Sequence, residues 1–324
     1  MTTLTIIIPV YNEAAGIQLL AQRLHQTFST ENCARHQVSQ VNYLFIDDGS
    51  QDNSVELLIQ NFTLGSTTKI IRFSRNFGHQ SAITAGMTFA NGDLIAIIDA
   101  DLQDPPEVIW QMVEKWREGY DVVYGQRANR KESPPKKFAY WLFYRIYKAL
   151  SPIEVPLDSG DFCLMTRRVV TQLNNLPERL RFPRGLRSWI GFKQIGVVYD
   201  RPERAAGITH YNFSRLYKLA TDGIASLSIR PLRLMQALAF FYLLASLVIL
   251  VFLLVKLPGS NEQRIEFYIL AMLILSSSSI TLLGQYILGA YVGRTYQEVK
   301  GRPNFIVQEI LGDNSAEPLI REKE

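Results

Sequence analysis

The chain has 324 residues, of which 47% are hydrophobic and 20% charged, and this composition excludes a disordered or fibrous protein. Its two cysteines, Cys33 and Cys163, lie far apart, which excludes a disulfide scaffold and a zinc ribbon. The net charge of +4 hides an asymmetry: residues 1–121 carry net −7, residues 122–233 net +12, and the remainder net −1. The basic block favours a membrane surface or a phosphate-bearing substrate over nucleic acid, for which no motif is present.

Strand-forming runs alternate with stretches of helical periodicity through the first 124 residues. The expected strands are 4–10, 41–46, 70–73, 94–98 and 122–124, and the expected helices are 14–28, 54–60, 80–90 and 106–118. This alternation predicts an α/β domain with a mostly parallel sheet covered on both faces. Ligands of such sheets bind beyond the carboxyl ends of the strands.

Acidic residues follow three of these strands and indicate a site there. They are Glu13 after the first strand, Asp47 and Asp48 after the second, and Asp99 and Asp101 after the fourth. The alternative is that Asp47, Asp48 and Asp52 only cap a turn and the helix that follows it. Neither common type of phosphate-binding glycine loop is present, so a bound nucleotide needs another counter-charge for its phosphates.

Asp99 and Asp101 form a candidate metal motif. Residues two apart on an extended chain point the same way, and two such carboxylates repel each other unless a cation lies between them. Mg²⁺ or Mn²⁺ suits oxygen ligands and also takes substrate phosphates. The motif continues with Gln103 and Asp104, and Pro105-Pro106 ends the strand. We therefore expect a metal that holds a diphosphate.

Two amphipathic helices are expected before the C-terminal apolar segments. Residues 136–150 combine aromatic side chains with Lys and Arg, and residues 209–229 carry apolar side chains at helical spacing. Both patterns are typical of helices at a membrane–water interface. The alternative for residues 136–150 is a buried helix with basic ends. A basic cluster at Arg179, Arg181, Arg184 and Arg187 is interpreted as a solvated or lipid-headgroup-facing surface.

Two uncharged stretches near the C-terminus are long enough to cross a membrane. Residues 234–255 and 267–292 contain no charged residue, and a spanning helix needs roughly 20 apolar residues. We therefore expect two transmembrane helices at about 232–256 and 267–292. Basic residues lie before the first helix and after the second, which places both termini in the cytoplasm. The polar residues Ser276–Ser279 of the second helix favour packing against another helix, and a homo-oligomer is possible.

The sequence resembles family 2 glycosyltransferases of the GT-A fold, in particular polyprenyl-phosphate glycosyltransferases. This group includes dolichyl-phosphate mannose synthase and the bacterial undecaprenyl-phosphate glucosyltransferases. The matching stretches are Ile8–Glu13, Asp47–Asp52, Ser74–Gln80, Asp99–Glu107, Tyr124–Arg127 and Asp158–Phe162. Together with the two C-terminal apolar segments, they cover nearly the whole chain.

The resemblance assigns roles to particular residues. The nucleotide is expected to contact Pro9, Tyr11, Glu13, Asp48, Gln80 and Asp99, and the metal Asp99, Asp101 and Gln103. Asp161 is the expected third catalytic carboxylate beside Asp99 and Asp101, with Asp158 as the competing candidate. Arg127 is expected to meet the phosphate of the lipid acceptor. Further acceptor or diphosphate contacts are assigned to Lys137, Arg201, Arg204, Thr209 and His210, and His210 stands where the family usually has lysine.

These observations predict an enzyme with three regions. They are a cytoplasmic GT-A catalytic domain at 1–230, two transmembrane helices within 231–293 and a cytoplasmic tail at 294–324. The expected reaction is metal-dependent, inverting transfer of a sugar from a nucleotide-sugar, a UDP-sugar by resemblance to the bacterial branch, to a polyprenyl phosphate such as undecaprenyl phosphate. The alternatives are another membrane-bound family 2 transferase, a processive polysaccharide synthase, or a non-catalytic membrane scaffold. The expected location is the cytoplasmic (inner) membrane.

Overall fold

The computed structural model describes residues 2–128, 159–200, 230–256 and 263–312. The strands are β1 Thr2–Val10, β2 Val38–Asp47, β3 Thr68–Phe73, β4 Leu94–Ile97, β5 Val122–Arg127, β6 Ser159–Thr166, β7 Gln194–Tyr199 and β8 Val307–Leu311. The helices are α1 Ala14–Thr27, α2 Thr30–Arg35, α3 Ser54–Asn61, α4 His79–Phe89, α5 Val108–Arg117, α7 Arg167–Asn174, α8 Pro183–Trp189, α10 Arg230–Lys256 and α11 Gln263–Val299.

All eight strands form one sheet in the order β7-β5-β6-β4-β1-β2-β3-β8. The neighbours β1–β2, β1–β4, β2–β3 and β5–β7 are parallel, whereas β6 runs antiparallel to both β4 and β5, and β8 runs antiparallel to β3. The expected mostly parallel α/β sheet is confirmed. The sequence analysis placed no strand after residue 124 and therefore missed β6, β7 and β8. Antiparallel β6 and β8 break the strand–helix alternation on which that analysis relied.

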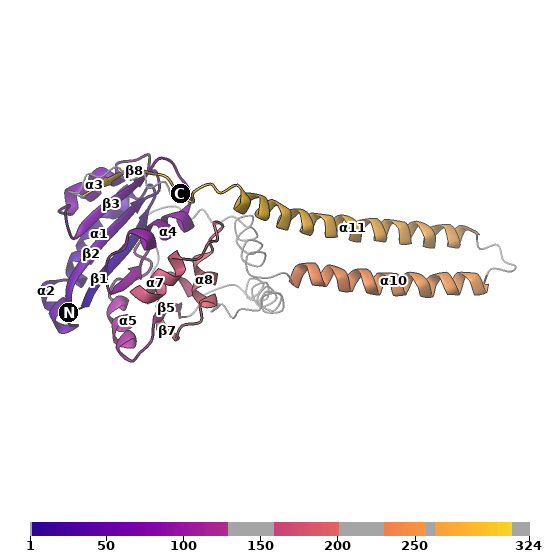
Figure 1. Cartoon of the computed structure of the whole chain (residues 1–324), viewed down its shortest axis with the longest axis horizontal. Coiled ribbons are helices and arrows are strands. Elements are labelled where there is room, and N and C mark those ends of the chain that lie inside the picture. The colour runs from indigo at the N-terminus through magenta and orange to yellow at the C-terminus, as the bar shows by residue number, and fades with distance from the viewer. Residues whose placement is uncertain (1, 129–158, 201–229, 257–262, 313–324) are drawn as a thin grey trace.

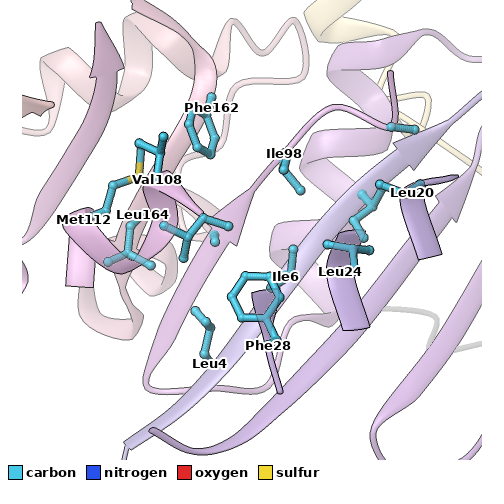
Figure 2. Packing of buried hydrophobic residues seen from close by; sticks show 14 of the residues in the cluster. Leu4, Ile6, Leu20, Leu24, Phe28, Ile98, Val108, Met112, Phe162 and Leu164 are labelled. Atoms are coloured by element: carbon cyan, nitrogen blue, oxygen red, sulfur yellow. The ribbon is translucent and has the colours of Figure 1, made fainter. Parts of the chain in front are cut away.

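Helices cover both faces of the sheet because the central strands are apolar on both sides. In β1, Leu4, Ile6 and Ile8 pack into one core cluster, while Ile7 packs into the other. Alternate residues of a strand point to opposite faces, so β1 contributes to both layers. Helices α1, α3 and α5 lie on the first face, and α4, α7 and α8 lie on the second. Figure 2 shows Leu20 and Leu24 of α1 packed near Ile6 on the first face.

The two longest helices lie side by side and project from the sheet (Figure 1). The α10 helix has 27 residues and α11 has 37, which correspond to about 40 and 55 Å at 1.5 Å per residue. The Tyr242 hydroxyl joins them by donating to the Leu273 carbonyl, and it lies 3.2 Å from Ser276 Oγ. Among the described residues, one stretch, Met272–Val299, is apolar and long enough to cross a membrane, and Ala237–Ile249 is a shorter apolar stretch. The expected pair of transmembrane helices is thus only partly supported.

The chain returns to the sheet after α11 instead of forming only a tail. The helix was expected to end near residue 292 but continues to Val299, where Gly301 at φ +66° ends it. Since the left-handed region favours glycine, Gly301 suits this position. The Phe305 ring then stacks on Phe73 at 5.2 Å, and β8 pairs with β3. Part of the expected 294–324 tail therefore belongs to the sheet domain.

Candidate active site

Hydrogen bonds join the loops that follow β1 and β2 at the carboxyl edge of the sheet. The Asn12 side-chain oxygen accepts the Gln51 amide at 2.8 Å, and the Asn12 amide donates to Ser50 Oγ at 3.0 Å. The Asp52 carboxylate accepts the first amide of α1 and the first amide of α3, both at 3.1 Å. The capping alternative is therefore confirmed for Asp52.

Asp47 and Asp48 are both buried at the end of β2 and hold different turns. Asp47 Oδ1 accepts the Ser50 amide at 3.0 Å, which is the capping role considered above. The two oxygens of Asp48 accept the amides of Phe77 at 2.7 Å and Gly78 at 2.9 Å. Burial raises the pKa of Asp48, and these amide bonds offset the rise only in part. Asp48 thereby fixes the loop that leads into α4.

Gly49 allows the β2 turn to approach this same loop. Its φ is +73°, and a Cβ at this position would lie 2.6 Å from the backbone carbon of Arg75. Any other residue would be strained in the left-handed region and would push the loop away. The loop ends at His79 and Gln80, which begin α4. The close contact therefore sets where these two side chains enter the site.

The antiparallel pairing of β4 with β6 brings Asp99 and Asp161 together. Ile97 of β4 pairs with Cys163 of β6. Continuing this register by two residues places Asp99, just after β4, opposite Asp161 in β6. The first residues of β6 therefore lie at the edge of the sheet where β1, β2 and β4 end. Chain segments more than 60 residues apart thus supply the two carboxylates.

His79 and Arg184 complete a cluster of charges around Asp161. His79 Nε2 lies 3.3 Å from Asp161 Oδ2 and 3.6 Å from Asp99 Oδ1. The Arg184 guanidinium donates two parallel hydrogen bonds to Asp161, from Nε at 2.7 Å and from Nη2 at 2.8 Å. The Asp161 side chain is only 3% exposed. Paired charge-assisted bonds of this kind are stronger than neutral ones, so this carboxylate is held in one orientation.

The electrostatics of the cluster shift the pKa values of Asp161 and Asp99 in opposite directions. Burial raises the pKa of Asp161, but the charge and hydrogen bonds of Arg184, together with His79, hold it well below its usual range. Burial raises the pKa of Asp99 to about 6, partly offset by His79 and reinforced by neighbouring carboxylates. Burial lowers the pKa of His79, but Asp161 and Asp99 outweigh this effect and raise it to about 9. His79 is therefore a cation near neutral pH.

Asp99 has the capacity to bind a further group. Its buried Oδ1 has no hydrogen-bond partner among the described residues. Nearby, Asp101 Oδ1 accepts the Gln103 amide at 3.1 Å, and Leu102 between them adopts φ +57°. Within the described part of the chain, no three His, Cys, Asp or Glu side chains are placed to hold a metal on their own. A cation bound here would need ligands from water or substrate as well.

Arg127 lies beside the start of β6. A Cβ on Gly160 would lie 3.1 Å from Arg127 Nη2, so the glycine leaves room for this guanidinium. The buried Arg127 Nε has no hydrogen-bond partner among the described residues. Behind it, the Tyr199 hydroxyl hydrogen-bonds Asp104, and burial together with Asp104 raises the pKa of Tyr199. Arg127 also hydrogen-bonds the Tyr199 side chain, and its Nε remains as a donor that an anion could accept.

The structure brings most of the expected site residues to the same edge of the sheet. Those that it describes there are Pro9, Tyr11, Glu13, Asp48, Gln80, Asp99, Asp101, Gln103, Arg127 and Asp161. Tyr11 is exposed, and the buried Gln80 Oε1 has no hydrogen-bond partner within the described ranges. Other expected residues, and the segments 136–150 and 209–229, lie outside the described residues. They are Lys137, Asp158, Arg201, Arg204, Thr209 and His210.

The interpretation of the basic cluster as a solvated or lipid-facing surface is wrong for two of its four members. Arg187 is 3% exposed and donates to the Gly160 carbonyl at 3.4 Å. Arg184 is bound to Asp161, as described above. The buried Asp161 carboxylate explains the position of Arg184, because a buried charge requires a partner, while Arg187 contacts the backbone next to that carboxylate. Arg184 and Arg187 therefore support the active site.

His79 and Arg184 were not among the site residues expected from the sequence. His79 was present only within the family stretch Ser74–Gln80, and a lone histidine carries little information by itself. Arg184 was grouped with its basic neighbours. The pairing of a buried carboxylate with an arginine 23 residues later gives no periodic signal in the sequence. Only the register of β6 and the position of α8 bring these groups together.

Comparison with known proteins identifies the family of this chain. Residues 5–173 match the family described as Glycosyl transferase family 2. The uncharacterized glycosyltransferase YkcC of Bacillus subtilis is 42% identical over 95% of this chain and 94% of its own length. The SfII prophage-derived bactoprenol glucosyl transferase of Shigella flexneri is 34% identical over 94% of this chain and 97% of its own length.

A solved structure is also similar, although more distantly. The glucosyl-3-phosphoglycerate synthase of Mycobacterium tuberculosis is 16% identical, with a TM-score of 0.46, and the match covers 69% of this chain and 78% of that one. The assignment of this chain instead depends on the family match over residues 5–173 and on relatives that align along nearly its full length. The protein is a glycosyltransferase and belongs to glycosyl transferase family 2.

Proposed function

We propose that this glycosyltransferase transfers a sugar from a nucleotide-sugar, a UDP-sugar in our proposal, to a polyprenyl phosphate such as undecaprenyl phosphate. The observation that carries the proposal is the juxtaposition of Asp99 and Asp161 at the carboxyl edge of the sheet, with Arg127 beside them. Relatives named bactoprenol glucosyl transferase align with 94% of the chain, which supports a lipid-phosphate acceptor.

The donor side of the site fits a divalent cation, Mg²⁺ or Mn²⁺. Asp99 Oδ1 accepts no hydrogen bond from the described residues, although His79 lies 3.6 Å from it, and it is a hard oxygen ligand. Asp101 follows two residues later. These two carboxylates would hold the cation, with Gln103 as a further ligand and the donor diphosphate completing the site. When bound, the cation would neutralise the charge of the departing diphosphate.

The nucleotide would lie over the ends of β1 and β2. Pro9 lies at the end of β1, Tyr11 and Glu13 follow that strand, and Asp48 follows β2. We propose that these residues contact the base and ribose. Gln80 enters from the start of α4. The exposed ring of Tyr11 offers an apolar face for the base. The buried Gln80 Oε1 without a described partner offers an acceptor to the donor.

The reaction would proceed by direct displacement. An oxygen of the acceptor phosphate attacks the anomeric carbon, a new carbon–oxygen bond forms, and the bond to the nucleotide diphosphate breaks with inversion. The nucleophile is already an anion, so the site must position and stabilise charge more than it must remove a proton. Arg127 would orient the acceptor phosphate. The low pKa of Asp161, caused mainly by Arg184 against the opposing effect of burial, keeps this carboxylate ionised beside the sugar.

The membrane arrangement follows from α10 and α11. Large apolar side chains along both helices are exposed, including Leu243, Leu247, Leu275 and Leu282. A lipid environment removes the cost of exposing them to water. We propose that both helices span the cytoplasmic membrane and that the catalytic domain and both termini face the cytoplasm. After α11 the chain returns to the sheet domain, as Figure 1 shows. A homo-oligomer would cover part of the exposed apolar surface.

The proposal is tested by sugar transfer to lipid with the purified full-length protein. Undecaprenyl phosphate is incubated with a panel of radiolabelled UDP- and GDP-sugars, with Mg²⁺, with Mn²⁺ and with a chelator. The expected result is label in the organic phase from one donor only when metal is present. Asp101→Asn should abolish this label. Label that enters the organic phase equally with chelator would contradict metal dependence, and a folded protein that transfers no sugar would contradict the proposed activity.

A further inference from the structure

The last turn of α11 is joined to the segment that carries Arg184. The Glu298 carboxylate accepts hydrogen bonds from two backbone amides of the 178–181 turn, and one of these amides is shared between its two oxygens. The Arg179 amide lies 3.1 Å from Oε1 and 2.9 Å from Oε2, and the Leu180 amide lies 2.7 Å from Oε1. The Arg179 side chain also donates to the Arg302 carbonyl at 3.2 Å. This turn therefore rests on the end of the long helix.

Glu298 lies in the last turn of α11, where an acidic residue is unfavourable. The carboxyl end of a helix carries partial negative charge and favours cations, while an acidic residue there is unfavourable. The last turn of α11 contains no basic residue. A residue that breaks a local rule commonly has a compensating role elsewhere. Here the compensation is the hydrogen bonding of two backbone amides from a separate segment of the chain.

The turn is fixed on its other side as well. The Arg181 guanidinium donates to the carbonyls of Asn174 at 3.2 Å and Leu176 at 2.7 Å, at the end of α7. Pro183 then starts α8, and Arg184 is the second residue of that helix. Only three residues lie between Leu180 and Arg184, whose side chain binds Asp161. The backbone between them has little freedom to absorb a displacement.

We propose that Glu298 is a positioning residue, which holds the 178–181 turn on the end of α11 and thereby sets Arg184 against Asp161. A long helix and the carboxylate cluster of the active site then move as one unit. The inference goes beyond the proposed function, and it depends on that function only where turnover is the measurement. A change at the carboxyl end of α11 is transmitted to Asp161 without contact with any substrate.

Amide hydrogen exchange of the full-length protein in detergent tests the connection without any substrate. Glu298→Ala should raise the exchange rates of amides in residues 179–189 and at the start of β6 by about tenfold, and leave β1 and β2 unchanged. Glu298→Gln keeps one acceptor oxygen and should stay within threefold of wild type. The matched control is Glu309→Ala, since Glu309 pairs with Arg72 at the opposite edge of the sheet. Glu309→Ala should raise amide exchange rates only in β3 and β8.

Two exchange results would overturn the inference. One is that the amides of α8 and β6 in the Glu298→Ala protein exchange at the same rates as in wild type. The other is an equal rise in every strand, which would mean general destabilisation. Because no substrate is present, neither result depends on whether the protein transfers sugar to a lipid.

A double-mutant cycle tests the route to turnover. Glu298→Ala should lower kcat about tenfold, which corresponds to about 1.4 kcal/mol, with the donor KM within twofold. In an Arg184→Lys background, the same change should lower kcat by less than twofold. A tenfold loss in both backgrounds would show that Glu298 acts by another route and would overturn the proposal. If the wild type transfers no sugar, the proposed function fails, and the exchange experiment still decides the inference.

Discussion

Replacing Asp99 by asparagine should stabilise the metal-free protein while it abolishes transfer. Burial is the main cause that raises the pKa of Asp99 from 3.8 to about 6. A shift of roughly two units corresponds to about 3 kcal/mol at 1.36 kcal/mol per unit. The side chain is 30% exposed, and solvent screening reduces the expected effect to about 1–2 kcal/mol. Asparagine has nearly the same shape and removes the charge that causes the penalty.

The direction of the Asp99 pKa shift determines how the stability gain of Asp99→Asn depends on pH. Because the pKa of Asp99 is higher in the folded protein, the ionised carboxylate destabilises the fold at pH values above about 6. As the pH falls from 6 toward 3.8, the folded protein takes up the proton and the penalty disappears. The advantage of Asp99→Asn should therefore be largest near pH 8 and fall to about half at pH 5. For a domain of about 200 residues, it corresponds to a melting temperature about 4 °C higher at pH 8.

Thermal unfolding in the presence of a chelator measures this difference. The matched control is Asp101→Asn, which removes a second carboxylate of the same motif. Asp101 accepts the Gln103 amide, so its replacement should give no gain and a loss of up to about 1 kcal/mol. The reasoning is refuted if Asp99→Asn melts below wild type at pH 8, or if its advantage is the same at pH 5 and pH 8.

Three further predictions concern the support of the site and the core. Arg184→Lys keeps the charge but cannot form the paired bonds to Asp161, so kcat should fall by about 10- to 100-fold in a folded protein; unchanged kcat in the transfer assay would contradict this. Gly86→Ala should cost about 1–3 kcal/mol, because its Cβ would lie 2.2 Å from Ile7 Cγ2. At Gly16 an added Cβ would meet open space, so Gly16→Ala should stabilise the protein by up to about 1 kcal/mol. Equal denaturation midpoints for the two glycine variants would refute the packing argument. The pKa of His79 is raised to about 9, so the stability it contributes is complete below about pH 6.5 and is lost as the pH rises through 9. The His79→Gln protein should not show this loss of stability between pH 7 and 10. Melting temperatures of wild type and variant that change in parallel with pH over this range would contradict the prediction.

The sequence was sufficient to predict the parts of the fold that follow a local pattern. The alternation of strands and helices predicted β1 to β5 and the helices α1, α3, α4 and α5, but not the short helix α2. The strand ends pointed to Asp48, Asp99 and Asp101. The strand and helix predictions succeeded because side-chain periodicity is a local property, and strand-end chemistry is the local property that makes the three carboxylates site candidates. The capping role of Asp52 was also left open as an alternative, and the structure confirms it.

The remaining features depend on contacts between distant segments. Asp161 was assigned from family resemblance, but its place opposite Asp99 follows from the β4–β6 register. The role of Arg184 follows from the packing of α8, and the return of β8 to the sheet depends on Phe305 and the pairing with β3. Tertiary packing of this kind overrides local propensity and leaves no periodic pattern in the sequence.

The central claim is that the sugar acceptor is the phosphate of a polyprenyl lipid. Mass spectrometry of the lipid product tests it most directly, with undecaprenyl phosphate and the phosphate-free alcohol undecaprenol offered separately with the donor selected from the panel. The account predicts one sugar added to undecaprenyl phosphate, with the phosphate retained, and no product from undecaprenol. Equal transfer to the alcohol, or release of free sugar with no lipid product, would contradict it.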